Sequence, residues 1–198
     1  MASPGIGKGR LEAFSDGVLA VIITIMVLEL HAPHEAELSA LLEAAPAFLA
    51  YVLSFIFVGI YWNNHHHLLH SVQHVNGTVL WANNLLLFCL SLVPFTTDWM
   101  GENHFAMWPV IVYGVDLLLA GVAFFLLAHS LIRLNGKDSA LAQALGSDLK
   151  GWVSPILYLV GILSAFIHPY LAYGIYTLVA LMWFVPDQRI ERLLRRER

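Results

Sequence analysis

The stretch Arg10–Leu30, RLEAFSDGVLAVIITIMVLEL, decides the fold class, because it has the apolar character of a membrane helix and yet contains acidic residues. Asp16 and Glu29 leave only residues 17–28 free of charge, which is about 18 Å of helix. A bilayer core is about 30 Å thick. Since charged groups at membrane depth normally face protein or a water-filled path, this first span is expected at a protein centre rather than at its rim.

The composition of the whole chain is that of an integral membrane protein. Hydrophobic residues make up 59% of the 198 residues and charged residues 12%, whereas about 25% charged is usual in soluble domains. No charged residue occurs between Glu43 and Asp98 or between Lys150 and Asp187, and each gap is long enough for two spans. The single Cys89 excludes an intrachain disulfide framework. Without a basic globular domain, nucleic-acid binding is not expected.

The apolar runs predict an all-α, polytopic membrane protein with six transmembrane helices in a single domain, residues 1–198. Breaks at Pro33, Asn76-Gly77, Pro94 and His168-Pro169 separate the runs. The predicted spans are 11–31, 45–67, 78–95, 105–133, 152–167 and 169–186, followed by a basic tail at 187–198.

A secretory signal peptide is the alternative interpretation of the first run, because a basic lead and a short apolar core precede small residues. Phe14-Ser15-Asp16 interrupts the approach to the apolar core and argues against this alternative.

The basic residues predict the orientation of the spans. All 10 Lys and Arg residues lie before the first span, between the fourth and fifth spans, or after the sixth. A six-span topology places these three segments on one side of the membrane, and the opposite loops hold no basic residue. The positive-inside rule therefore places both termini in the cytoplasm of a multi-pass protein of the inner (plasma) membrane.

The motif Arg10-x-x-x-Phe14-Ser15-Asp16, followed by Gly17-Val18-Leu19-Ala20 and a Thr-bearing apolar helix, resembles the signature of the transmembrane protein 175 family. Members of this family are potassium-permeable channels of lysosomes and prokaryotes that lack the usual selectivity-filter loop. The prokaryotic members have a similar length and six spans. The resemblance implies a potassium-permeable channel that assembles as a homotetramer in the lipid bilayer and needs no cofactor besides the permeant K⁺ ion.

A helical wheel separates a stripe of the first span from its polar motif. At about 100° per residue, Gly17, Val21, Thr24 and Leu28 fall on one narrow stripe, with Ile25 at its margin. The residues fit a packing face as well as a pore lining. The resemblance implies the pore lining, with apolar constrictions at Val21 and Leu28 and a hydroxyl ring at Thr24. Related chains have isoleucine where this chain has Val21. Since a TVGYG filter is also absent, only a modest preference for potassium over sodium is expected.

A second group of residues is expected to join the cytoplasmic ends of the first helices, because buried polar groups need partners. Trp62, Asn63 and nearby histidines would bind the polar residues of the motif, and Asn83 or Asn84 could join them. For the two asparagines, ordinary interhelical hydrogen bonding is the alternative. The predicted network comprises Arg10, Phe14, Ser15, Asp16, Trp62, Asn63, His66 and Asn84.

The histidines of the second span support an alternative function. His66, His70 and His74 are spaced i, i+4, i+8, and two histidines four residues apart can bind zinc. A secondary transporter of a divalent metal ion is therefore the alternative to a channel. Against it, the fifth and sixth spans contain no charge, and no Cys or acidic residue lies nearby to complete a site. The chain also lacks His-Glu-x-x-His and Gly-x-Ser-x-Gly motifs, so it is not expected to be an enzyme.

Overall fold

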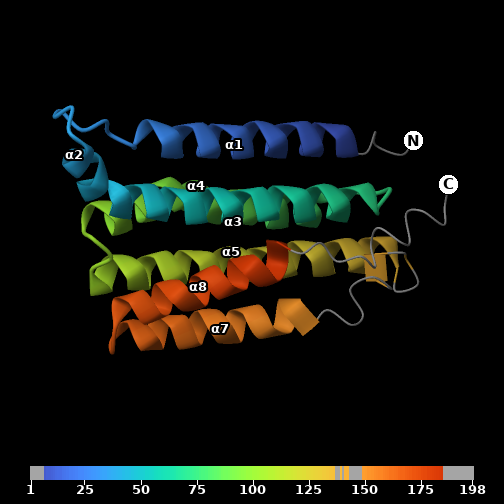
Figure 1. The fold of residues 1–198 in the computed structure, drawn as a ribbon. Helices are drawn as coiled ribbons and strands as arrows, with labels where there is room; N and C mark the ends of the chain where they lie inside the picture. Colours follow the sequence, from blue (N-terminus) through green and yellow to red (C-terminus); the bar gives the residue numbers. More distant parts are fainter. Residues whose placement is uncertain (1–6, 137–138, 140, 143–148, 185–198) are drawn as a thin grey trace.

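In the computed structural model, apolar helices lie side by side and alternate in direction along one axis (Figure 1). The structure describes residues 7–136, 139, 141–142 and 149–184, so the predicted tail at 187–198 lies outside the described residues. The described helices are α1 (Lys8–Leu28), α2 (Leu38–Glu43), α3 (Ala45–His70), α4 (Gly77–Glu102), α5 (Met107–Asn135), α7 (Leu149–Ala165) and α8 (Pro169–Phe184).

Four of these helices are long and apolar enough to cross a membrane. They are α1, α3, α4 and α5, which contain between 21 and 29 residues. Helices α7 and α8 are also apolar, and their described parts contain 17 and 16 residues, or about 25 Å. The predicted all-α membrane fold is thus confirmed, with four long apolar helices and two shorter ones.

Helix α4 is longer than the sequence predicted. The predicted span 78–95 stops near Pro94, whereas α4 continues through Pro94 to Glu102. Proline removes a backbone donor, but Ser and Thr side chains and neighbouring helices compensate for this loss inside membranes. The chain therefore reverses later than predicted, after Glu102.

Helix α1 lies at one edge of the chain and packs against α3 and α4 (Figure 1). This differs from the expectation of a central position. The reason is that α1 buries only one face, which carries Leu11, Ser15, Leu19, Ile22 and Met26. Any central position of α1 therefore requires other copies of the chain.

Helices α5, α7 and α8 form the opposite edge and are locked by the buried Tyr176. A Cβ atom added at Gly114 of α5 or at Gly161 of α7 would overlap the Tyr176 ring or hydroxyl. The Tyr176 hydroxyl also donates to the Val110 carbonyl oxygen at 3.4 Å. Two glycines thus allow one aromatic ring of α8 to fit between two helices.

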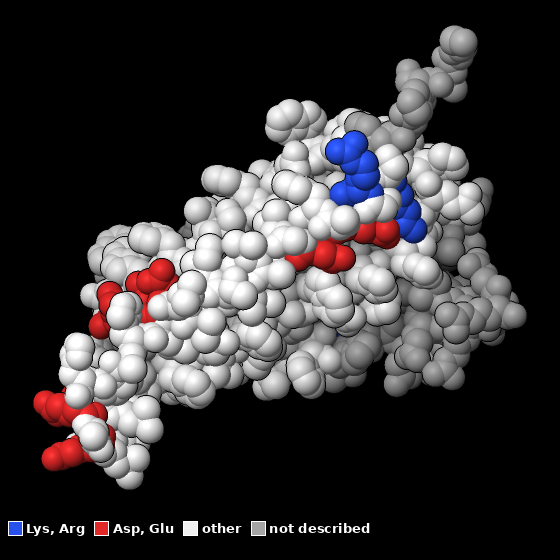
Figure 2. Space-filling view, turned by 90° about the horizontal axis from the view of Figure 1, so that it is seen from above, with Lys and Arg blue, Asp and Glu red and all other residues white. Residues whose placement is uncertain are grey.

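The basic side chains of the described residues lie at one end of the bundle, whereas acidic side chains lie at both ends. Lys8 and Arg10 begin α1, Arg133 lies near the end of α5 and Lys150 near the start of α7, so these four share one end. On the face shown in Figure 2, the blue side chains gather at that end with red side chains beside them, and further red side chains lie at the opposite end. The elements at the opposite end carry Glu29, Glu35, Glu37, Glu43, Asp98 and Glu102.

Candidate pore face and polar network of α1

The face of α1 that does not pack within the chain carries the stripe predicted from the sequence. Gly17, Val21, Thr24, Ile25 and Leu28 are all exposed in the single chain. The exposed fraction is 55% for Val21 and 76% for Leu28. These residues lie opposite the buried row, because residues three or four apart share a helix face. We call these five residues the open face of α1.

A hydrogen bond within α1 fixes the direction of the Thr24 hydroxyl group on the open face. This hydroxyl group donates to the Val21 carbonyl oxygen of the same helix at 2.8 Å. A threonine hydroxyl has one hydrogen, so the lone pairs of Thr24 Oγ1 remain for an outside donor or a cation. Chemically, this position can supply an oxygen ligand but no further proton donor.

The buried face of α1 carries a polar relay that joins three helices. His65 Nε2 of α3 lies 2.7 Å from Asn83 Oδ1 of α4, and Asn83 Nδ2 donates to Ser15 Oγ at 3.0 Å. Ser15 Oγ then donates to the Leu11 carbonyl oxygen at 2.9 Å. Since a carbonyl oxygen only accepts, His65 carries its proton on Nε2 in this arrangement. Ser15, His65 and Asn83 are all buried, so the relay satisfies groups that water cannot reach.

Asp16 makes a separate contact with α3. Trp62 Nε1 donates to Asp16 Oδ1 at 3.0 Å, and both side chains are exposed in the single chain. The sequence analysis placed this pair in its network. Two other members of the predicted network, Arg10 and Phe14, are exposed, with an exposed fraction of 57% for Phe14.

The relay includes one of the two asparagines named as candidates and a histidine next to the predicted one. Of Asn83 and Asn84, the structure places Asn83 between the helices, and Asn84 is exposed. His65 takes the place predicted for His66, which is exposed. Asn63 is half-buried and lies outside the relay. A signal for His65 exists in the sequence, because it continues the i, i+4 row of apolar residues that begins at Phe57 and Tyr61.

The histidines proposed for zinc do not form a site in the described part of the chain. His66 and His70 are exposed and stacked, with ring centroids 6.0 Å apart, and Trp62 stacks on the other side of His66. His74 lies beyond the end of α3, which contains residues only as far as His70. Among the described residues, no group of three His, Cys, Asp or Glu side chains could hold a metal ion. The i, i+4, i+8 spacing therefore fails because the helix ends before the third residue.

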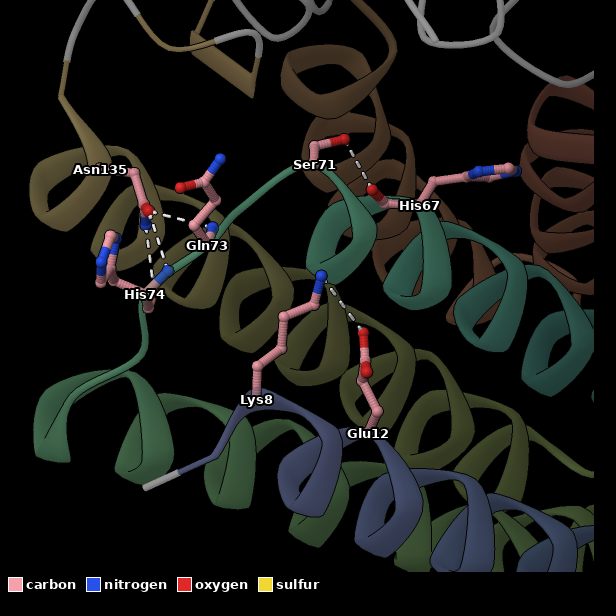
Figure 3. A network of polar contacts seen from close by, with 7 residues as sticks. All are labelled: Lys8, Glu12, His67, Ser71, Gln73, His74 and Asn135. Carbon is pink, nitrogen blue, oxygen red and sulfur yellow. Dashed lines mark hydrogen bonds and ion pairs between the residues drawn. The ribbon is translucent and has the colours of Figure 1, made fainter. Parts of the chain in front are cut away.

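Instead, His74 belongs to a connection that is fixed by α5 (Figure 3). Asn135 Oδ1 accepts from the backbone N–H groups of Gln73 and His74 at 3.3 Å and 3.2 Å. Asn135 Nδ2 donates to the His74 carbonyl oxygen at 3.2 Å. At the same end, Lys8 and Glu12 of α1 form an ion pair at 3.7 Å. These contacts hold the connection between α3 and α4 against the end of α5.

The sequence analysis missed a second buried polar cluster. Thr97 of α4 donates to Ser54 Oγ of α3 at 2.6 Å, and Ser54 Oγ lies 2.9 Å from the Tyr113 hydroxyl of α5. Nearby, Thr96 Oγ1 lies 3.2 Å from Asp116 Oδ2, and Asp116 is buried. Isolated Ser, Thr and Tyr residues in apolar runs carry no spacing signal, so the contacts of Ser54, Thr97 and Tyr113 were not predicted. A charged residue inside an apolar span is expected to face protein, as the buried Asp116 does.

The chain is similar to curated proteins over most of its length. It is 54% identical over 188 residues to a potassium channel of Chryseobacterium sp. (strain P1-3), covering 95% of this chain and 98% of that protein. A potassium channel of Chamaesiphon minutus is 32% identical over 185 residues, covering 87% of this chain and 91% of that protein. The endosomal/lysosomal proton channel TMEM175 of Homo sapiens is 33% identical over 101 residues, covering 45% of this chain and 20% of that protein.

The fold is also similar to a solved structure, that of a lysosomal potassium-selective channel TMEM175 homolog from Chamaesiphon minutus. The TM-score is 0.77 at 30% identity, covering 90% of this chain and 96% of the other. Residues 10–94 match the family described as endosomal/lysosomal potassium channel TMEM175. This segment starts at Arg10, the first motif residue, and includes all members of the polar relay.

The helices and the similarities define a multi-pass membrane protein of a channel family rather than an enzyme. The chain belongs to the TMEM175 family, as the motif of its first helix predicted.

Proposed function

We propose that the chain is a potassium-permeable cation channel in which α1 of four copies surrounds a central pore. The observation that carries this proposal is the open face of α1, which is exposed in the single chain although it is mostly apolar and follows directly on the best-defined motif of the chain. Two relatives that cover most of the chain are named potassium channels.

The chemistry of the open face supports the proposed path. Val21 and Leu28 lie about two turns apart, and four copies of each form apolar rings that can gate by dewetting. Thr24 lies between them, and its hydroxyl oxygen keeps lone pairs for a cation because its hydrogen is engaged by Val21. A single hydroxyl ring replaces few water molecules of an ion, so potassium is preferred over sodium only modestly.

The polar relay supports the same arrangement. The relay and the Trp62–Asp16 hydrogen bond hold α1 against α3 and α4 from the side, so that its opposite face is free for other copies. Lys8, Arg10, Arg133 and Lys150 share one end of the bundle, which favours a cytoplasmic location of that end in the inner (plasma) membrane.

Flux through liposomes tests the proposal. Reconstituted protein should pass potassium down its gradient without saturable coupling to protons or zinc, and its mass in detergent should correspond to four chains. Val21→Asn should wet the first constriction and raise the flux. The matched control is Val27→Asn, because Val27 is another exposed valine of α1 but lies off the stripe.

Two results would contradict the proposal. One is an equal change of flux in both valine variants, which would show that the pore does not follow the open face. The other is saturable zinc transport that is lost in His70→Ala, which would favour the metal transporter instead.

A further inference from the structure

A cavity of about 350 Å³ lies between α3, α5, α7 and α8, away from the open face of α1. Binding sites for small molecules have volumes of about 300–1,000 Å³ and are mostly apolar. The walls of this cavity are largely aromatic and include Tyr61, Phe124 and Tyr158. Neither the pore nor the polar relay uses these walls, so the cavity needs an explanation of its own.

The cavity is elongated along the helix axes. Its lining extends from Gly121 to Ile132 along α5 and from Gly151 to Tyr158 along α7. At 1.5 Å per residue these segments are about 10 to 16 Å long. One leaflet of a bilayer contributes about half of the core thickness of about 30 Å. The cavity therefore matches an acyl chain of one leaflet in both length and direction.

Two tryptophans place the outer end of the cavity at the membrane surface. Trp152, near the start of α7, has an exposed fraction of 69%, and Trp183 lies at the end of α8. Trp183 Nε1 donates to Ser154 Oγ at 2.8 Å, which fixes the indole. Tryptophan is enriched at the membrane–water interface because its ring is apolar and its N–H group is polar. On the lateral side of the cavity, the ring of the exposed Phe125 meets the Trp152 ring edge to face, with ring centroids 5.9 Å apart.

Basic side chains lie at this outer end. Lys150 Nζ is 5.9 Å from the centroid of the Trp183 ring, which lines the cavity. Arg133 is exposed and follows His129, a lining residue, by one helical turn on the same side of α5. Basic pockets between membrane helices on the cytoplasmic side suit anionic lipid headgroups. The apolar cavity, which is about as long as one leaflet is thick, thus ends at the two cations Lys150 and Arg133.

We propose that this cavity binds one acyl chain of an anionic phospholipid, with its phosphate group beside Lys150 and Arg133. A soluble anion has no apolar part that could cover the apolar walls of the cavity. These walls therefore favour a ligand with an acyl chain over a soluble anion. The two cations favour an anionic headgroup over a zwitterionic one. Binding of this lipid depends on the membrane fold but not on ion conduction, so its test is independent of flux.

Filling the cavity is the direct test. A Cβ atom added at Gly121 would be 3.7 Å from the Tyr61 hydroxyl and 3.9 Å from Tyr158 Cε2, so a larger side chain starts without a clash and occupies the space. Gly121→Leu is compared with Gly174→Leu on α8, where a Cβ atom would meet nothing within 4 Å. Native mass spectrometry measures retention of phosphatidylglycerol and phosphatidylcholine by each purified protein.

We expect the wild-type protein to retain one phosphatidylglycerol molecule per chain in preference to phosphatidylcholine. Gly121→Leu should lower this affinity about tenfold or more. This is the loss expected when roughly two methylene groups of the acyl chain are displaced from the apolar cavity. Gly174→Leu should bind as the wild type does. Lys150→Gln should weaken the binding of phosphatidylglycerol more than that of phosphatidylcholine and so reduce the preference.

A second measurement covers the case in which Gly121→Leu does not fold. The fluorescence of Trp183 is obtained as the difference between the wild-type protein and Trp183→Phe. Brominated phosphatidylglycerol should quench this fluorescence more than brominated phosphatidylcholine does. Equal quenching by both lipids, full lipid affinity in a folded Gly121→Leu, or a wild-type protein that retains no lipid would each overturn the proposal.

Discussion

Replacing Asn83 with leucine should destabilise the chain, because Asn83 is the central member of the relay between α3, α4 and α1. Leucine has a similar size but removes both hydrogen bonds, at 2.7 Å to His65 and at 3.0 Å to Ser15. Interhelical hydrogen bonds in membranes are worth about 0.6 kcal/mol on average, so the two bonds amount to about 1.2 kcal/mol. The substitution also leaves the buried N–H group of His65 without an acceptor, which costs about 1–3 kcal/mol. We therefore expect a total loss of about 2–4 kcal/mol.

Reversible unfolding in bicelles, followed by circular dichroism, measures this loss. The matched control is Asn84→Leu, because Asn84 is the next residue of α4 and is exposed. This variant should shift the free energy of unfolding by less than about 0.5 kcal/mol. Adding His65→Leu to Asn83→Leu should recover part of the loss, because replacing both partners removes the unsatisfied group. Equal stability of the Asn83 and Asn84 variants would refute the reasoning.

Three further predictions follow from the fold and the open face. Thr24→Val keeps the shape of the side chain but removes its oxygen, and should reduce the potassium-to-sodium flux ratio in liposomes without changing assembly; an unchanged ratio would exclude this oxygen from the ion path. Gly114→Ala should destabilise the protein by about 1–3 kcal/mol through overlap with Tyr176, measured by thermal unfolding, and wild-type stability would show that α5 and α8 can separate there. Cysteines introduced at Ala36 and Ser139 should react with a membrane-impermeant reagent from outside and from inside the cell, respectively, and the opposite pattern would reverse the proposed orientation.

The sequence predicted the helices better than the contacts between them. Lipid requires long apolar segments, so the spans could be recognised by composition. In residues 63–67 every residue is polar, so composition alone did not show which histidine turns inward; only the four-residue spacing of His65 from Phe57 and Tyr61 indicates it. The continuation of α4 through Pro94 was missed because proline usually ends helices in water. The edge position of α1 could not be predicted, because its open face is apolar like a buried one.

The connection between α7 and α8 has a consequence for how the chain enters the membrane. Only residues 166–168 separate the two helices, and the backbone N–H groups of Ile167 and His168 donate to the Ser164 carbonyl oxygen at 3.0 Å and 2.9 Å. A connection this short makes the two helices antiparallel neighbours. Helices α7 and α8 should therefore insert as one hairpin, in which Tyr176 meets Gly161 before the pair packs against α5.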